Sequence, residues 1–161
     1  GLAEERYGAG KGHTGLVVVL TFGTGIGSAV IHNGTLIPNT EFGHLEFHGH
    51  DAETLISGAA RERRGLGWKG WAKQFNLYLS RLELYFSPDL FIFGGGVSKE
   101  YAKWGKLVKT RSEVVTATFL NTSGIIGAAY AAGAHVLGDG ATSALVTDPA
   151  SGVGIVVPQD A

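Results

Sequence analysis

The chain has 161 residues, of which 44% are hydrophobic and 17% are charged, and its formal net charge is −1. This composition is typical of a globular protein with one hydrophobic core, and it argues against a strongly basic nucleic-acid-binding protein. The absence of cysteine excludes disulfides and thiolate metal sites, and no long apolar run or signal-like segment predicts membrane association, so we expect a cytoplasmic protein.

The first predicted element is the end of an amphipathic helix in "GLAEERYGAGKG", stopped by Gly8 and Gly10. No methionine occurs in the chain, and we expect that its N-terminus is cut. Strands are then predicted near residues 16–21, 26–32 and 35–37. Asn33-Gly34 is typical of a type I′ hairpin turn between the last two.

Three alternating glycines, Gly23, Gly25 and Gly27, lie between the first two predicted strands. A dinucleotide-binding fingerprint requires such glycines to open a helix, but "SAVIH" follows them and favours a strand. Successive backbone N–H groups in a strand–turn–strand unit can still form an anion-binding concavity, to which Thr21 and Thr24 add hydroxyl donors. The pattern predicts a phosphate-binding turn; the alternative is a hairpin whose glycines only supply positive φ.

Two helices are predicted after the loop that contains "NTEFGHLEFHGHDAE", the first from Asp51 to about Arg64. The second ends at Ser87-Pro88, and apolar residues at three- and four-residue spacing mark one face of it. These residues are Trp68, Trp71, Phe75, Leu79, Leu82 and Phe86. We expect the aromatic face to be part of the core rather than a binding surface, because a buried helix requires this periodicity.

A buried strand, "DLFIF", leads directly into a second glycine run, and a helix is expected from about Ser98. A nucleotide or phosphate could lie at this run beside the positive end of the helix; the alternative is a tight strand-to-helix connection. A further strand is predicted near residues 114–117, and "SGIIGAAYAAGAHVL" predicts a closely packed helix of small residues. The tail from residue 138 to 161 has no clear period and stays unassigned.

Four stretches resemble, in order, the sugar kinases of the ROK family, and more closely the polyphosphate glucokinase branch of that family: "LTFGTGIGSAVIHNG", "PNTEFGHLE", "DLFIFGGGVSK" and "NTSGIIGAAYAA". The resemblance covers about residues 1–133. It implies an α/β fold of the actin-like ATPase (ribonuclease-H-like) type, with an antiparallel hairpin meander and packed helices. It further implies that residues 1–137 are the C-terminal lobe and that most of the N-terminal lobe is missing.

The resemblance also implies which residues bind the substrates. The loop that holds the transferring phosphate matches Thr21, Gly23, Thr24, Gly25 and Gly27. The adenosine-side loop of ATP-dependent members, which lines the donor channel when the donor is polyphosphate, matches Gly94, Gly95 and Gly96. The sugar-contacting Glu-x-Gly-His motif matches Glu41, Gly43 and His44, and a further sugar-binding glutamate matches Glu53 more loosely. Carboxylates and an imidazole suit this role because they can fix sugar hydroxyls by hydrogen bonds.

The implied reaction moves a phosphoryl group from polyphosphate or ATP, with Mg²⁺, to the 6-hydroxyl of glucose, in an enzyme that is a homodimer when intact. The family's catalytic aspartate precedes the segment that "GLAEERYGAGKG" resembles, so we expect it upstream of Gly1. The chain then contains no catalytic residue of its own and is expected to be inactive alone. The same family includes sugar-sensing transcriptional regulators with an N-terminal helix-turn-helix, which is the alternative function.

Many members of the family bind structural zinc through a histidine and three cysteines in the sugar loop, and without cysteine no zinc is expected here. An alternative metal site is the alternating set His44, Glu46, His48 and His50, which would share one face of an extended segment. We expect instead that His48 and His50 are exposed loop residues.

Basic residues follow the second glycine run. Lys99, Lys103 and Lys106 are at helical spacing, and Lys109 and Arg111 come next. One interpretation is a track for a polyphosphate chain beyond its reacting end, and the alternative is a solvated basic helix face.

Overall fold

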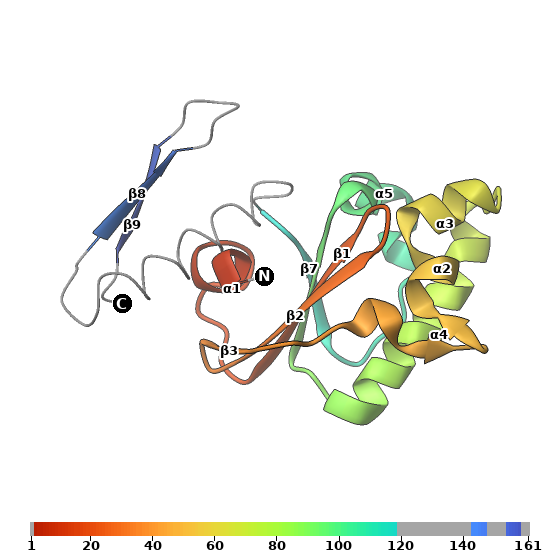
Figure 1. Ribbon diagram of the computed structural model, residues 1–161, viewed down its shortest axis with the longest axis horizontal. Coiled ribbons are helices and arrows are strands. Elements are labelled where there is room, and N and C mark those ends of the chain that lie inside the picture. The colour runs from red at the N-terminus through yellow and green to blue at the C-terminus, as the bar shows by residue number, and fades with distance from the viewer. Residues whose placement is uncertain (1, 119–142, 148–153, 159–161) are drawn as a thin grey trace.

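The computed structural model describes residues 2–118, 143–147 and 154–158 (Figure 1). Its centre is a five-stranded mixed sheet in the order β3-β2-β1-β6-β7. Three strands form an antiparallel meander, β1 (Leu16–Phe22), β2 (Ile26–His32) and β3 (Thr35–Ile37). The other two, β6 (Leu90–Gly94) and β7 (Glu113–Thr116), run parallel to β1. All five predicted strands are confirmed.

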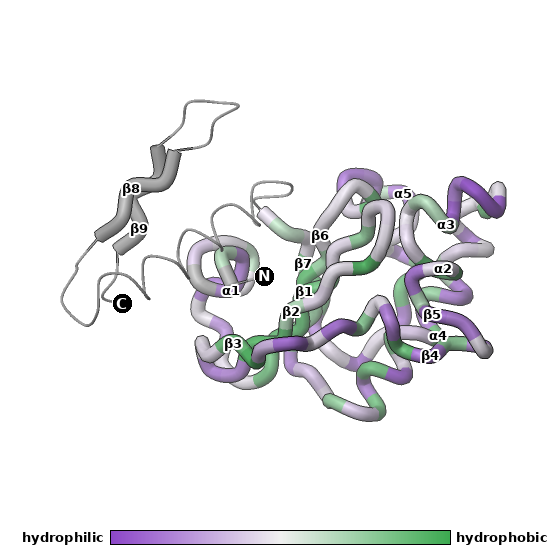
Figure 2. The backbone as a smooth tube through the Cα atoms, viewed as in Figure 1, coloured by the Kyte–Doolittle hydropathy of each residue, from purple (hydrophilic) through white to green (hydrophobic). Residues whose placement is uncertain are grey.

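The meander forms because its sequence is apolar and its turns fit. Asn33 and Gly34 have φ of 49° and 78°, as a type I′ turn requires, and the Asn33 side chain accepts a hydrogen bond from the N–H of Gly15 (2.8 Å). The central strands β1 and β6 are buried along almost their whole length because both faces of the sheet are covered. Figure 2 shows hydrophobic residues along the centre of the sheet.

The helix expected at the start of the chain is present as α1 (Leu2–Tyr7), and it ends before Gly8 as predicted. Gly1 lies outside the described residues, so the structure does not test the expectation that the catalytic aspartate precedes it. That expectation stays a prediction.

The described helices cover the two faces of the sheet unequally, as Figure 1 shows. One face carries α2 (Ala52–Ile56), α3 (Gly58–Arg63) and α4 (Trp68–Phe86), and α1 lies on the other. The centre of the predicted aromatic face is confirmed as core, because Trp71, Phe75, Leu79 and Leu82 are fully buried. At its two ends Trp68 is half-buried and packs against the core, whereas Phe86 is exposed. The helix ends at Phe86 as predicted, with Ser87 in the left-handed conformation before Pro88.

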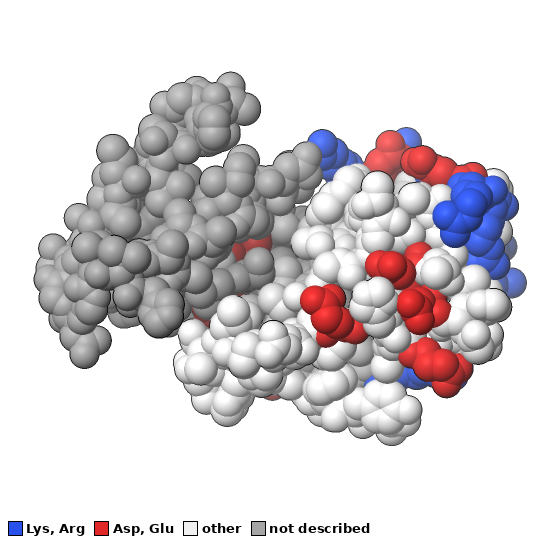
Figure 3. Space-filling model, in the orientation of Figure 1, with Lys and Arg blue, Asp and Glu red and all other residues white. Residues whose placement is uncertain are grey.

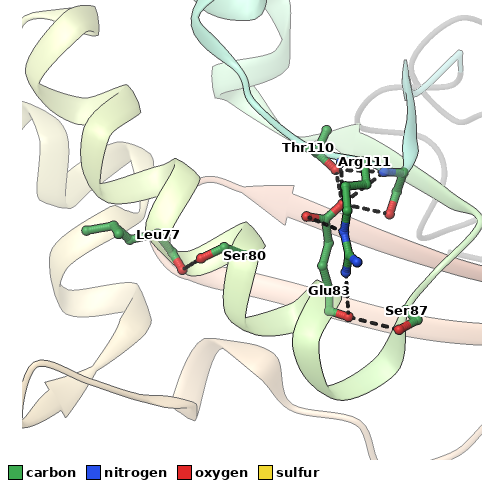
Figure 4. Close-up of polar contacts among 7 residues, drawn as sticks. Leu77, Ser80, Glu83, Ser87, Thr110 and Arg111 are labelled. Carbon is green, nitrogen blue, oxygen red and sulfur yellow. Dashed lines mark hydrogen bonds and ion pairs between the residues drawn. The ribbon is translucent and has the colours of Figure 1, made fainter.

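A buried carboxylate ties the end of α4 to the start of β7 (Figure 4). Glu83 Oε1 accepts hydrogen bonds from the Thr110 hydroxyl (2.5 Å) and from the backbone N–H groups of Arg111 (2.6 Å) and Ser112 (2.9 Å). Burial alone would raise the pKa of Glu83, but hydrogen bonds from Thr110, Ser112 and Arg111 outweigh it and lower the pKa. The segment that leads into the edge strand is therefore anchored to the core helix by a charged acceptor.

The helix predicted from Asp51 to Arg64 is wrong as a single element. It is divided into α2 and α3 at Ser57, whose ψ of 164° breaks the helical path. The Ser57 hydroxyl accepts a hydrogen bond from the N–H of Ala60 (3.2 Å) and so caps the second helix.

The helix predicted from Ser98 is also wrong as a regular element. A 3₁₀ helix (Gly96–Glu100), α5 (Tyr101–Trp104) and a second 3₁₀ helix (Gly105–Leu107) follow one another. The N–H of Tyr101 donates to the carbonyl of Ser98, as in a 3₁₀ helix, and the carbonyl of Val97, which Tyr101 would use in an α-helix, accepts the indole N–H of Trp104 instead (3.0 Å). Within residues 2–118, no long helix therefore begins at the second glycine run.

The remaining described elements are short. A 3₁₀ helix (Phe42–His44) precedes a hairpin of β4 (Glu46–Phe47) and β5 (His50–Asp51). Within the tail that the sequence leaves unassigned, β8 (Ser143–Thr147) pairs antiparallel with β9 (Gly154–Pro158). The helix predicted from Ser123 lies outside the described residues. Across the described part of the chain, no helix combines the length and apolarity that crossing a bilayer requires.

Candidate functional site

The two glycine runs meet at one edge of the sheet. Strands β1 and β6 are parallel neighbours, with Thr21 paired to Gly94, so the segments that follow them emerge side by side. A pocket of about 410 Å³ opens there, lined by Thr21, Gly23, Thr24, Gly25, Ile26, Gly27, Glu53, Gly95 and Gly96. All five candidate phosphate-binding residues are brought together, with two of the three glycines of the second run. Ligands of open α/β sheets bind at this place, beyond the carboxyl ends of the strands.

A second hollow of about 190 Å³ adjoins the first. Gly23, Thr24 and Gly96 line both, so the glycine turn stands between two spaces. Phe22, Gly58, Ala59, Glu62 and Val97 complete the smaller one, in which Glu62 is the charged lining residue.

None of Gly23, Gly25 and Gly27 has a positive φ. Close neighbours, rather than the backbone conformation, account for Gly25 and Gly27. A Cβ atom at Gly25 would overlap the carboxylate of Glu53, and one at Gly27 would lie 2.6 Å from Thr21 Oγ1. Gly23 is different, because a Cβ there would meet no heavy atom within 4 Å. Gly23 therefore faces the open pocket, and the positive-φ alternative does not explain the run.

In the second run, Gly95 and Gly96 differ in the same way. Gly95 has φ of +80°, and its Cβ would lie 2.6 Å from the carbonyl oxygen of Phe22. Gly96 is open. Gly94 lies inside β6, against Thr21 and Ala117, and does not line the pocket.

Glu53 is the sugar-site candidate that lines this pocket. It stands in the first turn of α2, and its Oε2 accepts a hydrogen bond from the backbone N–H of Ile26 (3.2 Å). Its carboxylate is therefore held against the glycine turn. Glu41 and His44 are exposed and do not line the pocket.

The backbone of the sugar motif is held from two sides. The Ser28 hydroxyl in β2 donates to the carbonyl of Thr40 (2.6 Å) and accepts from the N–H of Phe42 (2.9 Å). The Tyr78 hydroxyl in α4 donates to the carbonyl of Phe42 (3.1 Å). Phe42 is buried, so Glu41 and His44 project into solvent on either side of an anchored segment.

Asp51 is a residue of this site that the sequence reasoning missed. Its Oδ2 lies 3.0 Å from His44 Nδ1, since the β4–β5 hairpin folds Asp51 back beside the motif. The hydrogen bond to Asp51 and its negative charge raise the pKa of His44, and the charges of Glu53 and Glu41 add to the effect. The sequence signal that could have revealed this contact is the pair His48-Gly49 between β4 and β5. Its φ angles of 53° and 78° form the turn that reverses the chain.

That reversal rules out an extended segment from His44 to His50, on which the alternative metal site depended. His48 and His50 are exposed, as expected. In residues 2–118 and the two described tail strands, no group of three or more histidine, aspartate or glutamate side chains could hold a metal ion.

Charge is distributed unevenly around the site. Figure 3 shows acidic side chains gathered over α2 and the β4–β5 hairpin, where Glu46, Asp51 and Glu53 lie, and basic side chains over α3. Lys99, Lys103 and Lys106 belong to three successive short helices rather than to one regular helix, so their helical spacing does not define a common face, and the polyphosphate track stays a prediction. Lys103 is also paired with Glu100 (2.6 Å).

Comparisons with known proteins agree with this geometry, although no family model matches the chain. The chain is 57% identical over 131 residues to the polyphosphate glucokinase of Mycobacterium tuberculosis, covering 81% of this chain and 49% of that protein. It is 52% identical to the crystal structure of an inorganic polyphosphate/ATP-glucomannokinase from an Arthrobacter species, with a TM-score of 0.78, covering 81% of this chain and 51% of that one. The chain thus spans about half the length of these relatives.

The fold is also shared with a ROK family glucokinase from Streptomyces griseus in complex with glucose and AMPPNP, at 22% identity and a TM-score of 0.67, over 81% of this chain and 64% of that one. The mixed sheet and the glycine turn are shared with these sugar kinases, which have the actin-like ATPase fold. The chain belongs to the ROK family of sugar kinases.

Proposed function

We propose that the chain is the C-terminal lobe, over residues 1–137, of a polyphosphate glucokinase. The intact enzyme would transfer a phosphoryl group from polyphosphate or ATP to the 6-hydroxyl of glucose. The observation that carries the proposal is the pocket where the glycine turn, Gly95, Gly96 and Glu53 meet, in a chain 57% identical to a polyphosphate glucokinase.

The donor's transferring phosphate would lie on the glycine turn. Within the described residues, the backbone N–H groups of Thr24 and Gly25 donate to no protein acceptor, so they are available to phosphate oxygens. The hydroxyls of Thr21 and Thr24 add donors, and open Gly23 leaves room for close approach. Phosphoryl transfer depends mainly on positioning and on stabilising charge on the phosphate oxygens, which such a turn supplies.

The sugar would be held by Glu41, His44 and Glu53, through hydrogen bonds from its hydroxyl groups. The acidic surface around these residues suits a neutral sugar and disfavours a polyanion, so the donor is expected to enter from the side of the glycine runs. The base that takes the proton of the 6-hydroxyl would be an aspartate of the other lobe, upstream of Gly1.

Mg²⁺ is expected to enter as part of the donor complex, neutralising phosphate oxygens. The described residues offer no cluster that would hold the ion by themselves, and Glu53 is the carboxylate that lines the pocket. We further propose that the intact enzyme is a cytoplasmic homodimer that binds no nucleic acid and no membrane.

The test is a coupled assay for glucose 6-phosphate with the intact kinase, Mg²⁺ and either donor. The Thr21→Val and Thr24→Val variants should raise the KM for the donor and leave the KM for glucose nearly unchanged. A protein that binds glucose but shows no turnover with either donor, and whose intact chain begins with a helix-turn-helix, would instead be a sugar-sensing regulator.

A further inference from the structure

Three segments of the site converge on one oxygen atom. Glu53 Oε2 accepts from the N–H of Ile26 (3.2 Å) and occupies the space in which Gly25 would carry a Cβ. The same oxygen would lie 3.2 Å from a Cβ at Gly43, and that Cβ would be only 2.5 Å from the carbonyl oxygen of Ile26. Gly43 of the sugar motif therefore lies directly against Ile26 at the end of the phosphate turn, and the Glu53 carboxylate lies beside both.

The helix that carries Glu53 is fixed at both ends. The N–H of Ala52 donates to the carbonyl of Leu45 (2.9 Å), and the Trp71 indole donates to the carbonyl of Ile56 (2.7 Å). Ala52 and Ile56 are fully buried. Glu53 thus projects from a rigid element, which is what a residue needs if it is to hold a neighbouring turn in position.

We propose that Glu53 is a positioning residue that couples the two halves of the site: by holding the N–H of Ile26, it fixes the donor's phosphate turn relative to the sugar motif. The inference rests on the proposed function and adds a second task to a residue placed there as a sugar ligand. One oxygen holds the turn, and Oε1 remains for a sugar hydroxyl.

The coupling has an electrostatic consequence of definite sign. Glu53 puts a negative charge into a pocket that binds phosphate, so removing that charge should by itself strengthen the binding of a polyanion. Loss of the hydrogen bond to Ile26 should do the opposite, because the turn is no longer held in its binding conformation. If Glu53 contacted only the sugar, its replacement would cause no loss of affinity for the donor.

The experiment measures the binding of Mg²⁺-tripolyphosphate to the intact kinase by calorimetry without sugar, and glucose binding separately. Glu53→Ala should bind tripolyphosphate about tenfold more weakly than Glu53→Gln, because both variants lack the charge and only the alanine lacks the acceptor for the N–H of Ile26. Glu53→Gln keeps an acceptor for Ile26 and should bind tripolyphosphate at least as tightly as the wild type. Glu41→Ala is the matched control: it removes a carboxylate that has no contact with the turn, and should weaken glucose binding alone.

Gly43→Ala is a second variant, in case Glu53→Ala does not fold. Its methyl group should push the sugar motif and the turn apart and weaken tripolyphosphate binding although Gly43 is outside the phosphate pocket. Equal tripolyphosphate binding by folded Glu53→Ala and Glu53→Gln, or unchanged binding by Gly43→Ala, would overturn the coupling while leaving the proposed function intact. If the wild type binds neither probe and phosphorylates no glucose, the proposed function itself fails.

Discussion

The imidazole of His44 and the carboxylate of Asp51 lie 3.0 Å apart, both exposed beside the sugar motif. Because Asp51 accepts from Nδ1, Nε2 is left for a ligand. Asp51→Asn should lower the pKa of His44 toward its ordinary value of 6.5, although Glu41 and Glu53 still raise it. The ring-proton signals of His44, followed by NMR as the pH is changed, measure this.

A raised pKa also sets the sign of the pH dependence of stability. The pair stabilises the fold fully below pH 6.5, and this contribution is lost as the pH rises through the raised pKa of His44. Glu46→Gln, in the same hairpin but outside the pair, is the control. An unchanged titration of His44 in Asp51→Asn would show that the contact does not persist in solution.

Glu83→Gln should destabilise the fold by about 2 kcal/mol, because the part-buried hydrogen bonds from the N–H groups of Arg111 and Ser112 lose their charged acceptor. The pKa of Glu83 is lowered in the folded state, so its contribution is present above 4.5 and is lost as the pH falls through the lowered value. Urea unfolding at neutral and acidic pH should therefore show a difference between the variant and the wild type that shrinks in acid. A difference that stays constant with pH argues against this role, and exposed Glu62→Gln serves as the control.

Gly23→Ala and Gly25→Ala should differ although they are neighbours in one turn. A methyl group at Gly23 enters open space, so stability should change by less than about 0.5 kcal/mol while the donor KM rises. A methyl group at Gly25 overlaps Glu53, so the melting temperature should fall. Equal melting temperatures in the two variants would contradict the packing described for Gly25.

The chain of 161 residues alone should not phosphorylate glucose at an appreciable rate. General-base catalysis typically contributes about 10² to 10⁴ in rate, and the expected aspartate is not among its residues. A coupled assay with Mg²⁺ and either donor measures this, with the intact kinase as the positive control. Turnover by the chain alone would place the base within this sequence and overturn the roles given to Glu41 and Glu53.

Local patterns were sufficient to predict the strands and α4. These patterns are alternating or continuous apolar residues, the turn at Asn33-Gly34 and the helix end at Ser87-Pro88. Each depends on only a few neighbouring residues, so it can be recognised without knowledge of the tertiary structure. The glycine runs were found by the same means, and the parallel pairing of β1 with β6 brought them together.

What could not be predicted depends on side-chain contacts that a local pattern does not show. The carbonyl of Val97 accepts the indole N–H of Trp104 where a regular helix would use the N–H of Tyr101, although nothing in "GGGVSKE" indicates it. The role of Gly25 likewise depends on Glu53, a residue on another element. The three glycines of the turn were interpreted as evidence for a ligand, but two of them, Gly25 and Gly27, face the side chains of Glu53 and Thr21.

The contact of Gly25, Gly43 and Glu53 has an evolutionary consequence. A side chain at Gly25 would overlap the carboxylate of Glu53, and that space is left unfilled if the glutamate is shortened. Gly43 is restricted separately, because its Cβ would lie 2.5 Å from the carbonyl oxygen of Ile26 whatever residue replaces Glu53. Positions 25 and 53 should therefore change as a pair among descendants of a common ancestor, whereas position 43 should stay glycine.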